Sequence, residues 1–529
     1  MFEWLLVNGI LLGSLSPLLT FARLFQMKEW RLDRLGEHLR REGWITSLFG
    51  RARATIGIAY VALVTLVLSI ARTAIGEWND LAFNLGILLV GSIPLLTVIF
   101  GVLSMIDLAR PSRRIPTWTS KAILIVASAI LLIVATCTYV VFSISQQSFS
   151  EELILLPFIP LLQPAFVLLA WLLWKPVDWI LKNRLLTNAA IHRNTFDDAR
   201  VIGIVGSVGK TTTKELLKCV LADLSPITTP EHVNTELGVA SWIMKNVPAG
   251  ADKPLLIVEM GAYRKGEIAT LCRVAQPTVG VVTALGSDHL ALFGSEEAIV
   301  DANAEILDVL PKDSHAFLLS DNMASASLKE RVQCTVTLAG SADAKVIHTD
   351  RGLTLESNGA RFAVALHGMH NAGNAMLAVA VARHMGIADE RIRELLAKYR
   401  GSAHTFHLKK ERGVLVMDDT YNVSPLSFKA ALDWAKGRDE RPRVLLTSGL
   451  LETGTEETRY LKELGAAAAK SVERVVFTSD AGRSAFAKGF GKDVELLSPS
   501  TASVSDDGLL LCVGRMPPAT LRRLLPSDR

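Results

Sequence analysis

Cysteine is scarce in this chain. Only five cysteines occur among 529 residues, and their spacing matches neither a metal-binding motif nor a disulfide framework. The sequence therefore excludes a cysteine-ligated metal centre. We expect buried, reduced thiols at Cys137, Cys219, Cys272, Cys334 and Cys512.

A strong excess of charge of either sign is also missing. The 56 Lys and Arg residues are nearly balanced by 52 Asp and Glu, which leaves a formal net charge of +4. Most of the basic excess flanks long apolar runs, where it favours anionic membrane lipids as partners and not nucleic acid. The sequence shows no internal repeat and no low-complexity tract, which argues against a repeat architecture.

Charged residues are absent from five long segments in the first third of the chain. Half of all residues are hydrophobic and the mean hydropathy is +0.32, which is high for a soluble protein. Each segment is about long enough to cross a bilayer. A buried core helix is the alternative for any one of them, but five in succession favour a membrane domain, and no signal-peptide cleavage pattern accompanies them. The segments are residues 4–22, 54–71, 81–106, 122–142 and 153–174.

The loops between these segments alternate in charge. Residues 23–53 carry eight Lys or Arg and residues 107–121 carry four, whereas residues 72–80 carry one and residues 143–152 carry none. Basic loops stay in the cytoplasm. We therefore expect a multi-pass protein of the cell (inner) membrane, with its N-terminus outside and everything after residue 174 inside.

A phosphate-binding loop follows the membrane segments. Residues 201–205 predict a buried strand and residues 213–221 predict a helix, with a glycine-rich turn between them. Backbone N–H groups and the helix N-terminus then point at one anion, with Lys210 on the outer phosphates and Thr211 on Mg²⁺. The strict motif requires glycine where Ile204 stands, and the alternative is a turn without a ligand, but the lysine and threonine after a clean strand favour ATP or GTP. The expected nucleotide-binding residues of this loop are Gly206, Ser207, Gly209, Lys210, Thr211 and Thr212.

Two further polar residues come after apolar strands. Glu259 lies at the end of strand 254–260, and His289 follows strand 278–285. Carboxyl ends of parallel strands face the ligand crevice, so we expect Glu259 to reach Mg²⁺ and His289 to bind the metal or a transferring phosphoryl group. Taken alone, a Glu or His at the end of a strand is more often a solvent-exposed capping residue than a ligand-binding one. Together with Thr211 they predict a metal–phosphate site.

The rest of the sequence alternates short apolar strands with helical stretches, which is typical of a parallel α/β sheet. The 330 residues involved are too many for one such sheet, so we divide them near residue 400. The expected fold is an all-α membrane domain of five helices followed by α/β: a membrane domain at 1–180, a linker at 181–199, a P-loop ATPase-type central domain at 200–400 and a smaller Rossmann-like C-terminal domain at 401–529. The expected strands are 201–205, 254–260, 278–285, 315–320, 414–417, 443–447, 474–479 and 508–513.

Two more motifs add polar side chains. Asn371 and Asn374 open the helix predicted over 375–384, where they bond a base or ribose or merely cap the helix. Strand 414–417 is followed by a carboxylate, a phenol and an amide. Nucleotide sites often lie between two domains, so we include these side chains among the expected nucleotide-binding residues. They are Asp419, Tyr421 and Asn422.

These motifs in this order resemble the Mur ligase family, and above all its branch that joins D-alanyl-D-alanine to a UDP-muramoyl tripeptide of peptidoglycan. The resemblance covers residues 200–529 and includes the isoleucine that this family accepts at position 204. The matching segments are residues 206–213, 234–238, 259–262, 276–277, 288–290, 293–295, 370–374 and 418–425.

The resemblance implies an ADP-forming amide ligase of cell-wall synthesis that uses ATP and Mg²⁺. ATP phosphorylates a substrate carboxylate to an acyl phosphate, and an amine then attacks it to give an amide. By the same resemblance, Lys210, Glu259 and His289 carry the catalysis, and Asn234 and Thr235 contact substrate. The partners implied are a carboxylate acceptor and an amino donor.

Four departures from the family pattern stand out. Asn303 occupies the place of a lysine that is often carbamylated to hold a second metal, which puts that metal in doubt. His404 replaces an arginine that contacts the nucleotide phosphates, and we expect the same contact from it. Ser448 and Gly449 replace a Gly-Asp pair. Apolar segments stand where the UDP-binding domain is expected.

We therefore expect a membrane-anchored ligase whose acceptor is lipid-linked or membrane-proximal. One alternative is a ligase that extends a poly-amino-acid chain such as polyglutamate. Another is a catalytically inactive nucleotide-binding regulator in the membrane, which Asn303 and His404 would suit. A P-loop transport ATPase is disfavoured, because the chain has one P-loop and no transporter signature.

Overall fold

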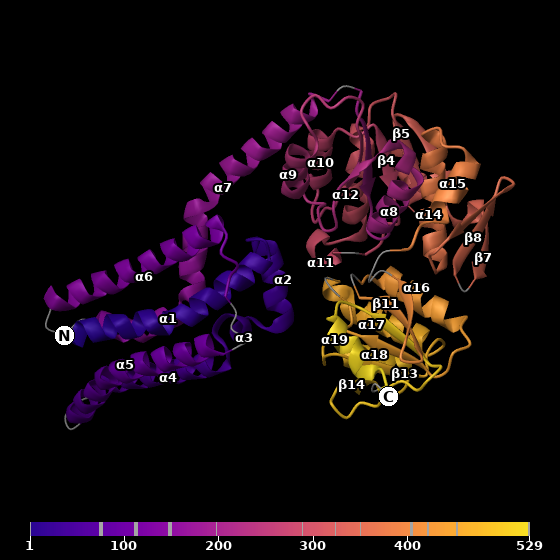
Figure 1. Ribbon diagram of the computed structural model, residues 1–529. Helices are drawn as coiled ribbons and strands as arrows, with labels where there is room; N and C mark the ends of the chain where they lie inside the picture. The colour runs from indigo at the N-terminus through magenta and orange to yellow at the C-terminus, as the bar shows by residue number, and fades with distance from the viewer. Residues whose placement is uncertain are drawn as a thin grey trace. The chain divides into compact units, whose positions relative to one another are not determined.

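The computed structural model describes residues 2–73, 78–110, 115–146, 151–196, 198–287, 289–322, 324–349, 351–401, 406–420, 423–450 and 453–526. The chain divides into two compact units, Met1–Leu181 and Lys182–Arg529 (Figure 1). The expected division of the second unit near residue 400 stays a prediction.

The first unit is helical. Among the described residues, four segments are long and apolar enough to cross a membrane: Leu6–Met27, Gly91–Ala109, Ser120–Val140 and Gln163–Arg193. Helix α4 covers the second expected span, and the count of five spans stays a prediction. The helices are α1 (Phe2–Met27), α2 (Leu32–Glu42), α3 (Trp44–Phe49), α4 (Arg51–Thr73), α5 (Trp78–Ala109), α6 (Ser120–Gln146), the 3₁₀ helix η1 (Glu151–Leu161) and α7 (Gln163–Arg193).

The fifth apolar run is not one membrane helix as we expected. Pro157 and Pro160 lie in η1, and α7 begins only at Gln163. Proline lacks the N–H that an α-helix needs and its ring clashes with the preceding turn, which disfavours one continuous α-helix here. Helix α7 then continues to Arg193, so the expected linker 181–199 is helical over most of its length.

The long helices of this unit pack closely inside and are apolar outside. A Cβ on Gly13 would lie 2.9 Å from Phe100 Cβ, so α1 and α5 approach each other where glycine leaves room. Large apolar side chains face outward on three helices, with Ile58, Leu131 and Leu173 exposed by 65%, 67% and 64%. Such outward apolar surface is unusual for a helix bundle in water.

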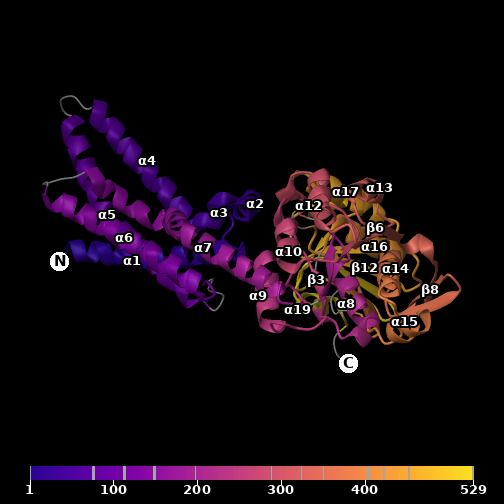
Figure 2. The ribbon, with the colours of Figure 1, turned by 90° about the horizontal axis from the view of Figure 1, so that it is seen from above.

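Successive long helices of the first unit run in opposite directions between its two ends. The N-terminal ends of α1 and α5 and the C-terminal ends of α4 and α6 lie at one end of the unit (Figures 1 and 2). The C-terminal ends of α1 and α5 and the N-terminal ends of α4 and α6 lie at the other. The two basic loops of the sequence flank the second set of ends.

The second unit begins with a parallel sheet of order β2-β3-β1-β4-β5-β6. Its two central pairs put Ile202 opposite Ile257 on one side and opposite Val279 on the other. The strands are β1 (Arg200–Val205), β2 (Ile227–Thr228), β3 (Leu255–Glu259), β4 (Val279–Val282), β5 (His315–Leu319) and β6 (Thr335–Ala339).

Helices cover both faces of this sheet, because alternate strand residues point to opposite sides. Ile202 and Ile204 belong to a core shared with α8 and α14. Val201 and Val205 belong to a core shared with α9, α10 and α12. The helices are α8 (Lys210–Val220), α9 (Glu236–Asn246), α10 (Glu267–Ala275), α11 (Leu290–Phe293), α12 (Glu296–Val309), α13 (Ser325–Arg331), α14 (Met369–His384) and α15 (Asp389–Leu396).

A second sheet has the order β10-β11-β15-β12-β13-β14 and is parallel except for β10, which runs antiparallel to β11. Its strands are β10 (His407–Glu411), β11 (Val414–Asp419), β12 (Arg443–Thr447), β13 (Arg474–Phe477), β14 (Glu495–Leu496) and β15 (Leu509–Val513). Its helices are α16 (Pro425–Lys436), α17 (Glu457–Ala468), α18 (Arg483–Phe490) and α19 (Pro518–Leu521).

All eight strands expected from apolar runs are present. Strands β2, β6, β10 and β14 and a small third sheet were not expected. The third sheet is antiparallel and consists of β7 (Lys345–Thr349), β8 (Gly352–Ser357) and β9 (Ala360–Val364). The expectation for the thiols is confirmed in part. All five cysteines are free, but Cys219 and Cys334 are only half-buried.

Candidate active site

The phosphate-binding loop leaves the middle of the first sheet. Strand β1 ends at Val205 between β3 and β4, and α8 begins at Lys210. Gly206 and Gly209 have φ values of +138° and +91°, which side chains rarely adopt, and a Cβ on Gly206 would lie 2.1 Å from Thr283 Oγ1. These two glycines therefore shape the turn. The first amides of α8 have no acceptor within the helix and are free for an anion.

Lys210 folds back over this loop. Its Nζ donates to the carbonyl oxygen of Gly206 and, at 3.0 Å, to that of Ser207. Within the described residues Lys210 forms no ion pair. Its charge is therefore met only by neutral carbonyls, and a phosphate is the partner that would compensate it.

Glu259 is the centre of a buried polar cluster at the carboxyl end of β3. Thr211 Oγ1 donates to the carboxylate and lies 3.1 Å from each of its oxygens, and Asn234 Nδ2 donates to Oε1 at 3.2 Å. Lys214 Nζ lies 3.2 Å from Glu259 Oε2 and its side chain is fully buried. The backbone N–H of Glu259 donates to Thr229 Oγ1 at 3.1 Å. The carboxylate is thus held firmly in one orientation beside the loop.

This cluster suits Mg²⁺ on a nucleotide phosphate. Mg²⁺ prefers hard oxygen ligands and is usually held by one or two protein oxygens, with phosphates and water completing the shell. Thr211 Oγ1 and the Glu259 carboxylate supply such oxygens side by side. In the described part of the chain no group of three or more His, Cys, Asp or Glu residues could hold a metal, so a fully protein-ligated ion is not indicated there.

His289 follows β4, which is separated in the sheet from β3 and its Glu259 by β1. It precedes α11 with a left-handed backbone, φ +58°, and its ring packs edge-on against Tyr263 at a centroid distance of 4.6 Å. Tyr263 belongs to the segment that follows β3. The histidine therefore lies beside the connection that leaves Glu259, and a metal or phosphoryl role for it stays a prediction.

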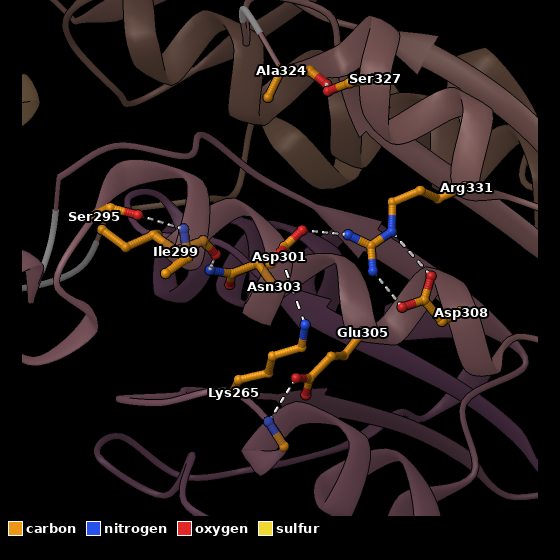
Figure 3. Close-up of polar contacts among 12 residues, drawn as sticks. Lys265, Ser295, Ile299, Asp301, Asn303, Glu305, Asp308, Ala324, Ser327 and Arg331 are labelled. Carbon is orange, nitrogen blue, oxygen red and sulfur yellow. Dashed lines mark hydrogen bonds and ion pairs between the residues drawn. The ribbon is translucent and has the colours of Figure 1, made fainter.

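Asn303 links the loop to helix α12. Its Oδ1 accepts the N–H of Gly206 at 2.9 Å, and its Nδ2 donates to the carbonyl of Ile299 at 2.8 Å. The residue is only 6% exposed. Figure 3 shows Asn303 on α12 between Ile299 and Glu305, which accepts the N–H of Gly266 at 2.6 Å. Both ends of the amide are occupied, so Asn303 acts here as a structural clamp on the loop.

Helix α14 brings the two asparagines to the loop. A Cβ on Gly209 would lie 2.6 Å from Asn374 Oδ1, so glycine is required for this approach. Asn374 Nδ2 donates to Asn371 Oδ1 at 3.2 Å, and Asn371 Nδ2 donates to the carbonyl of His367 at 2.9 Å. Both asparagines are buried, Asn374 is bonded within α14 and Asn371 is bonded to His367 just before it. Asn374 lies directly against the phosphate-binding loop.

The same helix reaches the end of β11. His370 packs on Phe406 at a ring distance of 5.1 Å, and the N–H of Phe406 donates to Asp419 Oδ1 at 3.3 Å. Burial lowers the pKa of His370 to about 4. Burial also raises the pKa of Asp419 to about 7, with the neighbouring Asp418 adding to the rise and the Phe406 hydrogen bond opposing it.

Several expected site residues are thus brought together, and others are not described. Contacts link the phosphate-binding loop to Glu259, Asn234, Asn371 and Asn374. Asp419 is connected to this group through Phe406, which packs on His370 of α14. Thr212 is buried in the first turn of α8, and Thr235 is the N-cap of α9 without a side-chain cap bond. Outside the described residues lie His404, Tyr421 and Asn422.

Sequence reasoning missed two members of the cluster, Lys214 and Thr229. Lys214 lies four residues after Lys210 and therefore on the same face of α8, which is a signal that the spacing already contained. Thr229 follows the two-residue strand β2 and carried no recognisable signal.

Comparison with known proteins agrees with this geometry. Residues 204–382 match the Mur ligase middle domain. The UDP-N-acetylmuramoyl-tripeptide--D-alanyl-D-alanine ligase of Synechocystis sp. is 31% identical over 268 residues, which are 50% of this chain and 58% of the relative. The corresponding ligase of Mycobacterium tuberculosis is 32% identical over 328 residues, 58% of this chain and 64% of the relative. The chain spans about three fifths of the length of these curated relatives.

Solved structures show the same fold. MurF ligase from Thermotoga maritima in complex with ADP has a TM-score of 0.56 at 24% identity and covers 65% of this chain and 82% of its own. MurF from Acinetobacter baumannii has a TM-score of 0.57 at 22% identity, over 63% of this chain and 77% of its own. The second unit therefore has a Mur ligase-like α/β fold, and its residues 204–382 are similar to the Mur ligase middle domain.

Proposed function

We propose that this chain is a membrane-anchored, ATP-dependent amide ligase that releases ADP and phosphate. The observation that carries the proposal is the contact of Thr211 with Glu259 beside a phosphate-binding loop whose Lys210 bonds, among the described residues, to carbonyl oxygens alone. The similarity to ligases that act on a UDP-N-acetylmuramoyl tripeptide and D-alanyl-D-alanine supports the reaction class. It points to cell-wall or cell-envelope synthesis.

The reaction proceeds in two balanced steps. A carboxylate oxygen of the acceptor attacks the γ-phosphorus of ATP, and ADP leaves. The nitrogen of the donor amine then attacks the activated carbonyl carbon, phosphate leaves, and the nitrogen gives up a proton. Lys210 neutralises charge that grows on the phosphate oxygens. Thr211 and Glu259 are the residues that would hold Mg²⁺, which would supply further positive charge there. Asn303 and Asn374 keep the loop in position.

The membrane location rests on the first unit. Four apolar segments of membrane-spanning length and outward-facing apolar side chains suit a bilayer, and basic loops at one end support a cytoplasmic position for that end. We extend the proposal to the acceptor: a carboxylate on a lipid-linked or membrane-proximal molecule, with an amino acid or peptide as donor.

The test uses the purified full chain in detergent and measures phosphate release that depends on an added amine. The acceptors compared are a UDP-muramoyl tripeptide, a membrane lipid extract and a short glutamate chain, with D-alanyl-D-alanine and single amino acids as amines. We expect amine-dependent turnover with the lipid extract and little with the soluble nucleotide. Efficient turnover of the UDP-muramoyl tripeptide alone would contradict the membrane acceptor and support synthesis of a soluble peptidoglycan precursor. Turnover only with glutamate chains would support the poly-amino-acid ligase.

Lys210→Ala is expected to lower the turnover number by about 10²–10³, because a charge on the developing phosphate oxygens is removed. Lys218→Ala is the matched control, since Lys218 is an exposed lysine on the same helix. Both variants should keep the thermal melting profile of the parent. A Lys210→Ala variant that still makes product at the parent rate contradicts the proposal. ATP binding by the parent protein without any amine-dependent phosphate release would favour the alternative of a catalytically inactive nucleotide-binding regulator.

A further inference from the structure

A cavity of about 500 Å³ lies in the first unit, at the end where α1 and α5 finish and α4 begins. Its volume falls within the range of about 300–1,000 Å³ that is typical of small-molecule sites. Four of its lining residues are basic or histidine: Arg23, His38, Arg53 and Arg110. Among the described lining residues Asp107 is the one carboxylate.

Arg53 is the buried charge of this cavity. It is only 9% exposed, and its Nε and Nη2 make no hydrogen bond to any described residue. Nη2 lies 2.9 Å from Asp107 Oδ2 without the alignment of a hydrogen bond. A buried donor without an aligned acceptor is costly, so the Arg53 guanidinium keeps hydrogen-bonding capacity for a further anion beside Asp107.

The charged side chains around Arg53 have a net positive charge. Asp107 is shared, because its Oδ1 also lies 3.2 Å from Arg110 Nη1. Arg23 Nη1 donates to the carbonyl of Ile115 at 2.9 Å, which is a neutral acceptor. One carboxylate therefore faces three guanidinium groups. An anion of one or two negative charges would compensate the remainder.

The rest of the lining is largely apolar. Leu24, Leu48, Phe49 and Leu108 border the cavity together with Pro17, which lies inside α1. The cavity also lies where the apolar segments Leu6–Met27 and Gly91–Ala109 end, which is the level of lipid head groups if these segments span a bilayer. Figure 1 shows α2 and α3 at this same end of the unit. A phosphate attached to an acyl or prenyl chain has both the charge and the apolar surface that this lining requires.

We propose that this cavity binds the phosphate head group of an anionic membrane lipid, with Arg53 and Arg110 on the phosphate. The inference rests on the proposed membrane location and is independent of the proposed ligase chemistry. The binding site is formed by the first unit alone.

The test titrates the purified full chain with short-chain lipids below their micelle concentration and measures heat. The probes are dioctanoyl phosphatidate, dioctanoyl phosphatidylcholine and inorganic phosphate. We expect phosphatidate to bind and the other two to bind at least about tenfold more weakly, because only phosphatidate combines an uncompensated anion with acyl chains. Inorganic phosphate that binds as tightly as phosphatidate would show a simple anion site and overturn the lipid assignment.

Variants locate the binding. Arg53→Gln is expected to weaken phosphatidate binding by about tenfold or more, because it removes a buried charged donor. Ser47→Glu, at a half-exposed residue of the lining, should have the same effect by repulsion while both Arg53 and Asp107 are retained. Arg51→Gln is the matched control, an exposed arginine two residues away that does not line the cavity.

Unchanged binding in a monodisperse Ser47→Glu protein overturns the proposal, even if Arg53→Gln fails to fold. Lys210→Ala should bind phosphatidate like the parent. A protein that binds phosphatidate but has no ligase activity would refute only the proposed function, and an active ligase that ignores phosphatidate would refute only this inference.

Discussion

At the scale of single residues, Asn303 shows how a change of side chain alters the role of a position. The resemblance to Mur ligases places a lysine there that is often carbamylated and holds a second metal. In this chain the amide oxygen instead accepts the N–H of Gly206, and the amide nitrogen bonds the carbonyl of Ile299. An amide cannot form a carbamate. We infer that this position, instead of contacting a metal, holds the phosphate-binding loop through the hydrogen bond from Gly206.

This exchange predicts two results for Asn303. Turnover should be the same in buffer stripped of bicarbonate as in buffer containing it. Asn303→Ala should raise the KM for ATP by roughly tenfold, because a buried N–H of the loop loses its acceptor at a cost of about 1–3 kcal/mol. Asp301→Ala is the control, because Asp301 lies two residues away on α12 and its carboxylate is half exposed. Loss of activity on removing bicarbonate would show that another lysine holds the carbamate.

Asp419 predicts a dependence of stability on pH. Burial raises its pKa to about 7, whereas an aspartate in the unfolded chain ionises near pH 4. As pH rises from about 4 to about 7, the unfolded chain releases this proton and the folded chain retains it. The free energy of unfolding therefore falls across that window, by about 1–4 kcal/mol, and stays low above it.

Asp419→Asn removes this effect, since the amide cannot ionise and its oxygen can still accept the N–H of Phe406. The variant should melt at a higher temperature than the parent at pH 8 and at the same temperature at pH 4. Asp439→Asn, at an exposed position, should follow the parent at both values. A parent and an Asp419→Asn protein with parallel melting curves from pH 4 to pH 8 would mean that Asp419 is ionised in the folded state.

At the scale of elements, strands that are buried on both faces were predictable and the others were not. Strands β3, β12 and β15 are buried at every residue and appear in the sequence as continuous apolar runs. Strands β7 and β10 have exposed or half-exposed residues throughout and contain lysine and histidine, so no apolar run marks them. They lie at sheet edges, where burial does not select the side chains.

The same distinction applies to the site. The phosphate-binding loop is local, because a strand end, two glycines and a helix start lie within a few residues, and the motif alone predicts it. The contacts of Asn303 with Gly206 and of Lys214 with Glu259 join positions far apart in the sequence. They follow only from the order of the strands, with β1 between β3 and β4, which no local pattern specifies.

At the scale of the whole molecule, the ends of the helices in the first unit agree with the charge of the loops. The basic loops 23–53 and 107–121 flank the end that holds the C-terminal ends of α1 and α5 (Figures 1 and 2). The N-terminal end of α1 and the C-terminal end of α6 lie at the opposite end. Lysine and arginine resist transfer across the bilayer, so the basic end is expected in the cytoplasm.

This orientation predicts the activity of reporters fused to the chain in cells. Alkaline phosphatase, which is active only outside the cytoplasm, should be active when fused after residue 146, at the end of α6, and inactive when fused after residue 529. A fluorescent protein that matures only in the cytoplasm should give the opposite result at both positions. The C-terminal fusions carry the decisive information, because a ligase that consumes ATP requires a cytoplasmic site. An active phosphatase after residue 529 would invert the orientation and would remove ATP-dependent ligation from consideration together with it, since the same residues 182–529 carry the phosphate-binding loop.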